Sequence, residues 1–364
     1  SGHAVHRPHR CRPPPPGPAS RVELSSSQPL DAVPERSDAL VPAAALVYPA
    51  PMTFAFIFPG QGSQAPGMGK GLYDAFGASR EVFQEIDEAL GEKLSRLIFE
   101  GPADELTLTA NAQPALMAVS IAAMRALDRE FGVTASKAAF VAGHSLGEYS
   151  ALAAAGALSV SDAARLLRTR GNAMQAAVPV GEGAMAALIG KVDVALAEEI
   201  AAKGAEAGPC VVANDNNIGN VVISGSKAGI DAALAYAKEK GARAIPLNVS
   251  APFHSPLMQP AADAMAEALA GASIAPLVAP LVANVTARPV QEPSTIRKLL
   301  VEQVTGRVRW RESVEWMAGE GGVSRFIEVG AGKQLSGMVK RNAPDAEALA
   351  LNEPADLEAF AKTI

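Results

Sequence analysis

From residue 53 onward, short runs of consecutive apolar residues alternate with longer segments in which apolar residues recur every three or four positions. The runs TFAFIF (53–58) and KAAFVAG (137–143) are almost uninterrupted. Continuous apolar runs of this length predict strands that are buried on both faces, as in a parallel sheet. We predict helices at 72–90, 114–131 and 146–158. The pattern therefore predicts an α/β fold in which helices cover a mainly parallel sheet.

Residues 181–248 show a second, self-contained order of elements. We predict, in chain order, a strand at 184–190, a helix at 192–204, strands at 210–214 and 220–225, a helix at 227–242 and a strand at 243–250. The segment DNNIG between the two middle strands is typical of a turn. This β-α-β-β-α-β order is that of a ferredoxin-like unit. We therefore expect a ferredoxin-like subdomain at 181–248, inserted into a large α/β-hydrolase-like catalytic domain (52–180 and 249–364), with the active site between them.

The first 51 residues differ from the rest of the chain. They contain 11 of the 27 prolines, including the run Pro13–Pro16, and three of the five histidines. A proline-rich segment of this kind cannot bury enough apolar surface to offset the entropy lost on ordering, so we predict a disordered N-terminal extension. Met52 precedes the first predicted strand and is interpreted as the natural start. A targeting segment is the alternative, against which the proline density counts.

Composition and charge exclude several classes of function. The chain has 364 residues, of which 49% are hydrophobic and 19% charged, as is typical of a globular α/β protein. Its net charge of −6 does not favour binding to nucleic acid. No apolar run approaches the roughly 18 residues of a membrane helix, and Cys11 and Cys210 form no metal or disulfide pattern. We expect a monomeric, cytoplasmic protein that binds neither nucleic acid nor membrane and contains no metal or other cofactor.

The segment GHSLG (143–147) lies between a predicted strand and a predicted helix. A serine in G-x-S-x-G on a sharp strand-to-helix turn is the arrangement of a nucleophile elbow. Serine needs a base within hydrogen-bond distance, and histidine is the usual one because its pKa lies near neutrality. After residue 51 the chain contains two histidines, His144 and His254. Because neighbouring side chains on such a turn diverge, His254 is the candidate base if Ser145 is a nucleophile.

A glycine-rich loop, FPGQGSQAPGMGKG (58–71), follows the first predicted strand. It does not match a phosphate-binding P-loop, because position 64 is glutamine and Gly71 replaces the hydroxyl residue that should follow Lys70. Such a loop can instead place a backbone N–H beside the nucleophile, as one half of an oxyanion hole. The N–H of Leu146 is the candidate for the other half.

Six segments together resemble the malonyl-CoA:acyl-carrier-protein transacylases of type II fatty acid synthesis. They occur in the order of that family: FPGQGSQ (58–64), GHSLGEYSAL (143–152), RTRG (168–171), NVVISG (220–225), VSAPFHSPLM (249–258) and EVGAGKQLSGMVKR (328–341). The resemblance implies an acyl-carrier-protein S-malonyltransferase. In such an enzyme malonyl passes from malonyl-CoA to a serine, and then to the phosphopantetheine thiol of acyl carrier protein.

The resemblance also implies roles for individual residues. Ser145 is expected to accept malonyl as an ester, with His254 as its base and later as the acid that protonates the departing thiolate. The N–H groups of Gln61 and Leu146 are expected to form the oxyanion hole. Arg170 is expected to bind the free carboxylate of malonyl through its planar guanidinium.

The resemblance further implies that the backbone carbonyl of Gln303 orients His254, which gives a Ser–His dyad without an aspartate. One alternative is a serine thioesterase or esterase, but such hydrolases carry their histidine late, and here 110 residues follow His254 without another histidine. Another alternative is a polyketide-type acyltransferase that uses a different extender unit, such as methylmalonyl. Phe253 favours malonyl, because its ring would fill the space beside malonyl C2.

The implied partners are malonyl-CoA, CoA and an acyl carrier protein, which is generally acidic. Because this chain is acidic too, docking requires a local basic patch. The candidate residues fall into two sets, first Arg297, Lys298, Arg307, Arg309 and Arg311, and second Lys333, Lys340 and Arg341.

Overall fold

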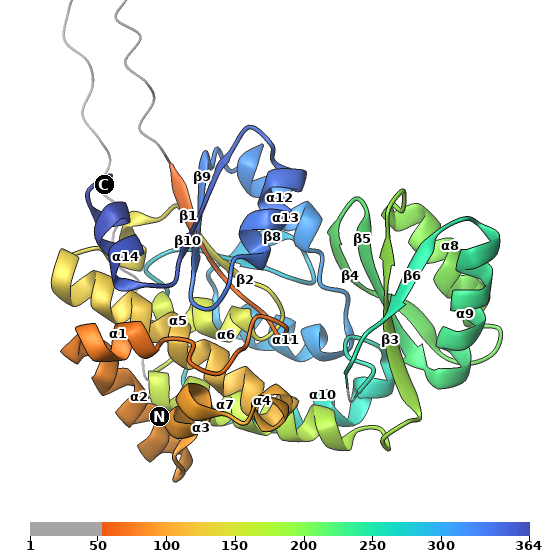
Figure 1. Ribbon diagram of the computed structural model, residues 1–364, viewed down its shortest axis with the longest axis horizontal. Helices are drawn as coiled ribbons and strands as arrows, with labels where there is room; N and C mark the ends of the chain where they lie inside the picture. The colour runs from red at the N-terminus through yellow and green to blue at the C-terminus, as the bar shows by residue number, and fades with distance from the viewer. Residues whose placement is uncertain (1–52, 250) are drawn as a thin grey trace, which may run out of the picture. The chain divides into compact units, whose positions relative to one another are not determined.

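The computed structural model describes residues 53–249 and 251–364. The extension predicted to be disordered (1–51) lies outside these residues. The strands of the described part form two separate sheets (Figure 1). No helix in this part of the chain is long and apolar enough to cross a membrane.

The larger sheet contains the strands predicted from the buried runs. In spatial order its strands are β10 (Glu347–Leu351), β9 (Arg325–Val329), β1 (Phe54–Phe58), β2 (Phe140–Gly143), β7 (Leu281–Ala283) and β8 (Arg288–Val290). Neighbouring strands are parallel except β7 and β8, which pair antiparallel at one edge. Strand β2 is shorter than the run 137–143, because a 3₁₀ turn at Ala135–Lys137 precedes it. The predicted fold class, an α/β protein with a mainly parallel sheet, is confirmed.

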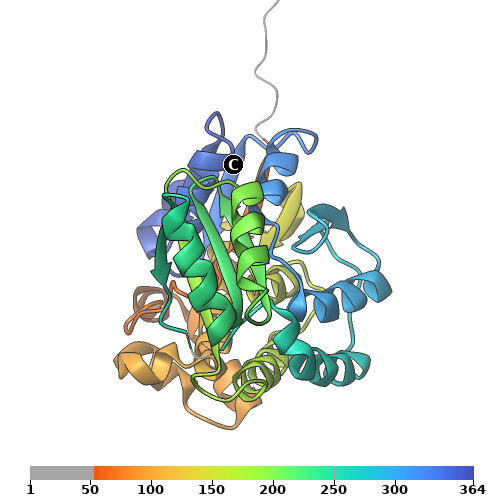
Figure 2. The ribbon, with the colours of Figure 1, turned by 90° about the vertical axis from the view of Figure 1, so that its right-hand side faces the viewer.

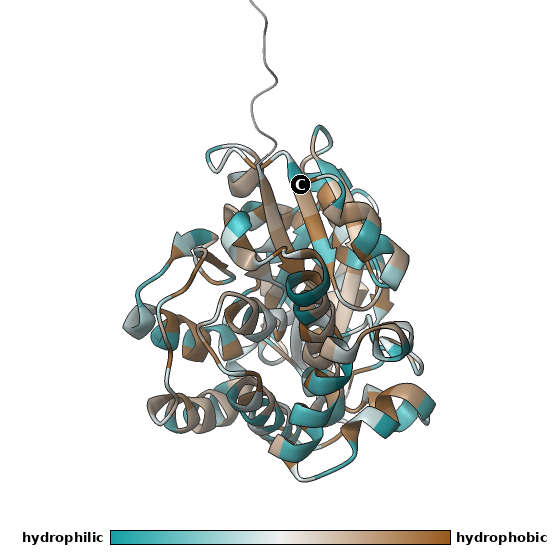
Figure 3. Ribbon diagram, turned by 90° about the vertical axis from the view of Figure 1, so that its left-hand side faces the viewer, coloured by the Kyte–Doolittle hydropathy of each residue, from teal (hydrophilic) through white to brown (hydrophobic). Residues whose placement is uncertain are grey.

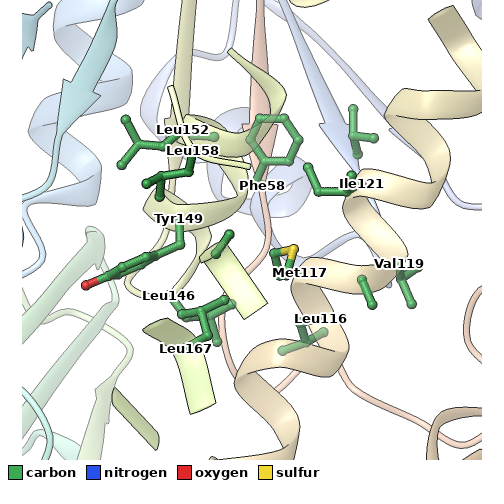
Figure 4. Packing of buried hydrophobic residues seen from close by; sticks show 14 of the residues in the cluster. Phe58, Leu116, Met117, Val119, Ile121, Leu146, Tyr149, Leu152, Leu158 and Leu167 are labelled. Carbon is green, nitrogen blue, oxygen red and sulfur yellow. The ribbon is translucent and has the colours of Figure 1, made fainter. Parts of the chain in front are cut away.

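Strand β1 shows why the apolar runs are continuous. Side chains alternate between the two faces of a strand, and both faces of β1 are covered. Phe54, Phe56 and Phe58 belong to one hydrophobic core, whereas Ala55 and Ile57 belong to another. Figure 4 shows Phe58 in the first core, close to residues of the helices that follow β1 and β2.

Two sets of helices cover the larger sheet. The first core is covered by α1 (Lys70–Ala75), α2 (Gly77–Leu90), α3 (Leu94–Glu100), α4 (Ala103–Thr107), α5 (Thr109–Phe131), α6 (Gly147–Ala154), α7 (Val160–Ala176), α10 (Gln259–Ala270), α11 (Pro293–Thr305) and α14 (Pro354–Ala361). The second core is covered by α12 (Trp310–Ala318) and α13 (Gln334–Asn342). Many of these helices carry both hydrophilic and hydrophobic residues (Figure 3), as expected when one helical face packs on a sheet.

Helix α5 begins five residues earlier than predicted, at Thr109, and contains Pro114 in its interior. Proline lacks an N–H, so it leaves the carbonyl four residues before it without its usual helical partner. That carbonyl belongs to Ala110, and it accepts a hydrogen bond from Arg168 Nη1 at 2.5 Å. A side chain from α7 thus replaces the missing backbone donor, and the helix continues through the proline.

The smaller sheet follows the predicted order of elements. They are β3 (Gly183–Ile189), α8 (Val194–Gly204), β4 (Cys210–Asn217), β5 (Asn220–Ser226), α9 (Lys227–Glu239) and β6 (Arg243–Pro246). The sheet is antiparallel with the strand order β4-β5-β3-β6, and α8 and α9 pack side by side on one face (Figure 2). These elements enclose a hydrophobic core of their own. The separate sheet and core support a subdomain at 181–248, whose boundaries stay a prediction.

Strand β4 is longer than predicted. DNNIG was expected to be a turn, but β4 continues to Asn217, and the turn to β5 consists of Ile218 and Gly219. Gly219 has a φ of 85°, a value that glycine adopts without strain, so a two-residue turn suffices. The added residues of β4 pair with β5, and on the outer edge of this edge strand the N–H of Asp215 donates to the Val308 carbonyl at 3.0 Å.

Candidate active site

The turn GHSLG joins β2 to α6 and brings the backbone of two glycines into close contact. A Cβ atom on Gly143 would lie 1.9 Å from the carbonyl group of Gly147. A Cβ atom on Gly147 would lie 2.4 Å from the carbonyl oxygen of Phe58 in β1. Ser145, between them, has a φ of 54°, which is strained for a residue with a side chain. The two glycines therefore allow a turn that projects the serine away from the sheet.

Ser145 and His254 lie together although 109 residues separate them in the chain. Ser145 Oγ is 2.7 Å from His254 Nε2, and His254 Nδ1 is 2.8 Å from the backbone carbonyl oxygen of Gln303. A neutral imidazole that donates from Nδ1 to this carbonyl has Nε2 free to accept the serine proton. His144 faces elsewhere, with Nε2 2.8 Å from Asn216 Oδ1.

The surroundings of His254 keep its ring neutral. The side chain is only 3% exposed, and burial, together with the nearby charge of Arg170, lowers the pKa of His254 to about 3. The Gln303 carbonyl opposes this change because it stabilises the protonated ring. The lowered pKa allows His254 to act as a base, since a histidine with a pKa well below neutrality is unprotonated at pH 7.

Arg170 comes from α7 and is 1% exposed. Its Nη1 donates to Gln113 Oε1 at 2.7 Å, and its Nη2 donates to Gln303 Oε1 at 2.8 Å and to Ser145 Oγ at 3.2 Å. Its Nε has no hydrogen-bond partner within the described residues. Burial lowers the pKa of Arg170. All its side-chain contacts are to neutral groups, so the guanidinium has no ion-pair partner in residues 53–249 and 251–364.

Gln61 and Leu146 lie beside Ser145 in the same pocket. In the described part of the chain, neither residue donates its backbone N–H to a protein acceptor. The N–H of Ser145 itself is already bound to Asn284 Oδ1 at 2.9 Å. Two unpaired N–H groups next to a serine hydroxyl are the composition of an oxyanion hole.

The pocket that contains these groups has a volume of about 470 Å³ and is lined by strands of the smaller sheet and by loops and helices of the larger part of the chain. Met185, Ala187 and Val222 contribute an apolar wall from the smaller sheet, and Phe253 and Met174 contribute apolar surface near His254 and Arg170. No group of three or more histidine, cysteine, aspartate or glutamate side chains in the described residues is arranged to bind a metal ion.

Several polar residues of the site carried no signal in the sequence. Gln113, Glu148 and Asn284 are buried around Arg170 and Ser145, and none of them was predicted. Glu148 lies within the segment GHSLGEYSAL, but nothing in the segment shows that its carboxylate points into the protein. The six residues predicted for the site, Gln61, Ser145, Leu146, Arg170, His254 and Gln303, are brought together around the pocket.

An α/β fold whose pocket pairs a serine with a neutral histidine defines a class of enzymes that form an acyl-serine intermediate. The chain belongs to the acyl transferase domain family, whose model matches residues 55–351. It is 49% identical to the malonyl CoA-acyl carrier protein transacylase of Bacillus subtilis, over 85% of this chain and 96% of that relative. The resemblance inferred from the six segments is confirmed.

Solved structures agree with this assignment. An acyl-carrier-protein S-malonyltransferase from Bartonella henselae is 56% identical with a TM-score of 0.83, over 86% of this chain and 99% of that chain. A malonyl-transacylase solved in complex with a type II PKS acyl-carrier protein is 40% identical with a TM-score of 0.82, over 86% of this chain and 100% of that chain.

Replacement of Gly143 by alanine is expected to displace the Ser145 turn, because the new Cβ atom would overlap the Gly147 carbonyl. The rate at which a fluorophosphonate modifies Ser145 should fall roughly 10²-fold, the cost of about 1 Å of misplacement. Gly337→Ala is the matched control, since a Cβ atom there meets nothing within 4 Å. An unchanged modification rate in Gly143→Ala would show that the close contact does not define the turn.

Proposed function

We propose that this chain transfers the malonyl group from malonyl-CoA to the phosphopantetheine thiol of acyl carrier protein, through a malonyl ester of Ser145. The observation that carries the proposal is the position of Arg170. It is a buried cation without an ion-pair partner in the described residues, and its Nη2 lies 3.2 Å from the Ser145 hydroxyl. An acyl group that ends in a carboxylate would supply the missing anion. The names of the relatives support the same reaction.

In the first half of the reaction, His254 takes the Ser145 proton as Oγ attacks the thioester carbonyl of malonyl-CoA. The N–H groups of Gln61 and Leu146 stabilise the oxyanion of the tetrahedral intermediate, a contribution of roughly 3–4 kcal/mol per donor in comparable sites. The C–S bond then breaks, and the CoA thiolate takes the proton from His254. In the second half, the carrier thiol gives its proton to His254 and attacks the ester, and Ser145 leaves and regains a proton.

The malonyl carboxylate also changes the basicity of His254. In the free enzyme the charge of Arg170 is one cause of the low pKa of His254. A carboxylate bound to Arg170 offsets that charge, so His254 becomes a stronger base when an acyl group of the right kind is present. An acyl group without a carboxylate would leave the histidine a weaker base. Arg170 would therefore contribute both to binding and to the choice of acyl group.

The contacts of His254 favour this reaction over that of a triad hydrolase. Its Nδ1 lies 2.8 Å from a carbonyl oxygen, that of Gln303, where a triad would have a carboxylate. The choice between malonyl and a branched extender depends on Phe253, which lines the pocket next to His254. Its ring leaves less room for a methyl group at C2, a difference typically worth about 1–3 kcal/mol.

Incubation with radiolabelled malonyl-CoA and no carrier protein is expected to place one malonyl group on Ser145, which peptide mass spectrometry would locate. Ser145→Ala should take up no label, because Ser145 carries the hydroxyl that His254 Nε2 contacts in the described residues. Addition of carrier protein should then move the label to the carrier. Label on another residue would contradict the mechanism, and release as free malonate in the presence of carrier would indicate a hydrolase.

Arg170→Ala is expected to reduce malonyl transfer roughly 10²-fold or more and to retain acetyl transfer, since removal of a buried charge partner costs about 3–5 kcal/mol. The ratio of kcat/KM for malonyl-CoA and acetyl-CoA measures this selectivity. Arg168→Ala is the matched control in the same helix, because Arg168 binds Ala110, Asn111 and Glu92 instead of the pocket. A ratio that Arg170→Ala leaves unchanged would exclude the guanidinium as the carboxylate ligand.

The two candidate sets of basic residues differ in how their charges are used. In the first set, Arg297 donates to backbone carbonyls, and Lys298, Arg307, Arg309 and Arg311 form ion pairs. In the second set, Lys333, Lys340 and Arg341 are exposed and form no ion pair within the described residues. The second set lies on or next to α13, and Gln334, Leu335 and Met338 of that helix line the pocket. We therefore favour the second set for carrier docking.

Lys340→Glu is expected to raise the KM for carrier protein roughly 10-fold at low salt, because the rate of association with an acidic partner depends on such charges. Acylation by malonyl-CoA alone should not change. The difference from wild type should shrink at high salt, which screens exposed charges. Lys298→Glu is the control from the first set, and a larger effect there would place the docking surface on α11.

A further inference from the structure

We propose that Glu148 is a positioning residue for acyl transfer. Through hydrogen bonds to Asn284 and Gln303, it fixes both the Ser145 turn and the Gln303 carbonyl that orients His254. The inference rests on the proposed function, since it concerns the same nucleophile and base. Glu148 is 1% exposed and is absent from the pocket lining, so it acts through other residues and does not touch the substrate.

The backbone of Ser145 is held on both sides by side-chain amides. Its N–H donates to Asn284 Oδ1 at 2.9 Å, and its carbonyl accepts from Gln303 Nε2 at 2.9 Å. Asn284 Nδ2 also donates to the Gly143 carbonyl at 2.8 Å, so one amide group connects the backbone of Gly143 to that of Ser145. A serine with a φ of 54° keeps that conformation only where its surroundings hold it. The amides of Asn284 and Gln303 stabilise this conformation of Ser145.

Glu148 fixes both amides. One carboxylate oxygen accepts the backbone N–H of Asn284 at 2.7 Å, and the other accepts Gln303 Nε2 at 2.5 Å. Asn284 follows β7 and Gln303 lies in α11, so the carboxylate joins two elements that are remote in sequence. Glu148 itself lies in the first turn of α6, where the helix dipole favours a negative charge.

The same side chain lies on the other side of the Gln303 amide from Arg170. Arg170 Nη2 donates to Gln303 Oε1, while the Nε2 of that amide donates to Glu148. The Gln303 amide therefore links the guanidinium to the Glu148 carboxyl group, with its oxygen toward the Arg170 donor and its NH₂ group toward the Glu148 acceptor. Burial raises the pKa of Glu148 to about 8, and its Asn284 and Gln303 hydrogen bonds and the charge of Arg170 oppose that rise.

The base is coupled to this arrangement through the backbone of Gln303. Its carbonyl accepts the Nδ1 hydrogen of His254, so a shift of Gln303 moves the group that orients the imidazole. Loss of the Glu148 carboxylate would free the Gln303 side chain and Asn284 together. Nucleophile and base would then lose their alignment, although the carboxylate of Glu148 is hydrogen-bonded to neither of them.

The test is Glu148→Gln, which keeps the size of the side chain but places an NH₂ group opposite one of two N–H donors. The kcat of malonyl transfer is expected to fall roughly 10²-fold with the KM for malonyl-CoA within about threefold, because the alignment changes and the pocket does not. The rate at which a fluorophosphonate modifies Ser145 should fall in parallel.

Asp87→Asn is the matched control, because Asp87 is a buried acid that accepts two hydrogen bonds from Ser95 in α2 and α3, away from the pocket. It should lower Tm and leave kcat at the wild-type value. If Glu148→Gln does not fold, Asn284→Asp serves instead, since it keeps the acceptor for Ser145 N–H and replaces the donor to Gly143.

Wild-type kcat in Glu148→Gln, or a loss of kcat no larger than that of Asp87→Asn, would overturn the positioning role. The outcome for the proposed function is separate. A wild-type enzyme that forms no malonyl-serine would refute malonyl transfer, whereas the fluorophosphonate rates of the variants would still report whether Glu148 aligns Ser145.

Discussion

The charge of Arg170 lies where water does not reach it, and this constrains the residues around it. A buried guanidinium without hydrogen-bond partners is very unfavourable, so its donors must bind acceptors of the protein or of a ligand. Gln113 in α5 and Gln303 in α11 supply amide oxygens to its two terminal nitrogens. Helices from distant parts of the chain must therefore meet at one point on α7. The position of the nucleophile and its base follows from that meeting.

This arrangement also explains how the site works without an acidic partner for histidine. A carboxylate beside His254 would raise the pKa of His254 and bind Arg170, which would occupy the place of an anionic acyl group. A carbonyl oxygen orients the ring and leaves the guanidinium available. The site thus combines a weak base, His254, with a cation that has no ion-pair partner in the described residues, Arg170. A carboxylate that binds Arg170 would also make His254 a stronger base. The buried side chain of Glu148 holds the Gln303 amide from the side away from Arg170 and does not line the pocket.

The smaller sheet completes the pocket and is joined to the larger part at strand β4. The extended end of β4 pairs with Val308, the carboxylate of Asp215 binds Arg311, and the side chain of Asn216 contacts His144 next to the nucleophile. The apolar wall from β3 and β5 therefore lines the same pocket as the serine. An apolar wall of this kind disfavours water near an acyl ester, which is a requirement for transfer in preference to hydrolysis.

The sequence by itself determined the elements and the principal groups of the site. Continuous apolar runs indicated β1 and β2 because both faces of each strand are buried, and the glycines of GHSLG indicated a turn too tight for side chains. The scarcity of histidine pointed to His254, and the family resemblance pointed to Arg170, Gln61 and the carbonyl of Gln303. These features are local, or depend on residue type alone, so a linear pattern preserves them.

Only the tertiary structure decided which polar groups meet. Asn284 lies 139 residues from the serine whose N–H it accepts, and Arg168 lies 58 residues from the carbonyl that Pro114 leaves free. Such hydrogen bonds depend on how helices and strands pack, and no periodicity in the chain encodes them. The prediction of a turn over all of DNNIG was wrong, because Asp215 and Asn217 pair with β5 and only Ile218 and Gly219 remain for the turn. Glu148 was visible in the sequence, but its burial beneath Ser145 was not.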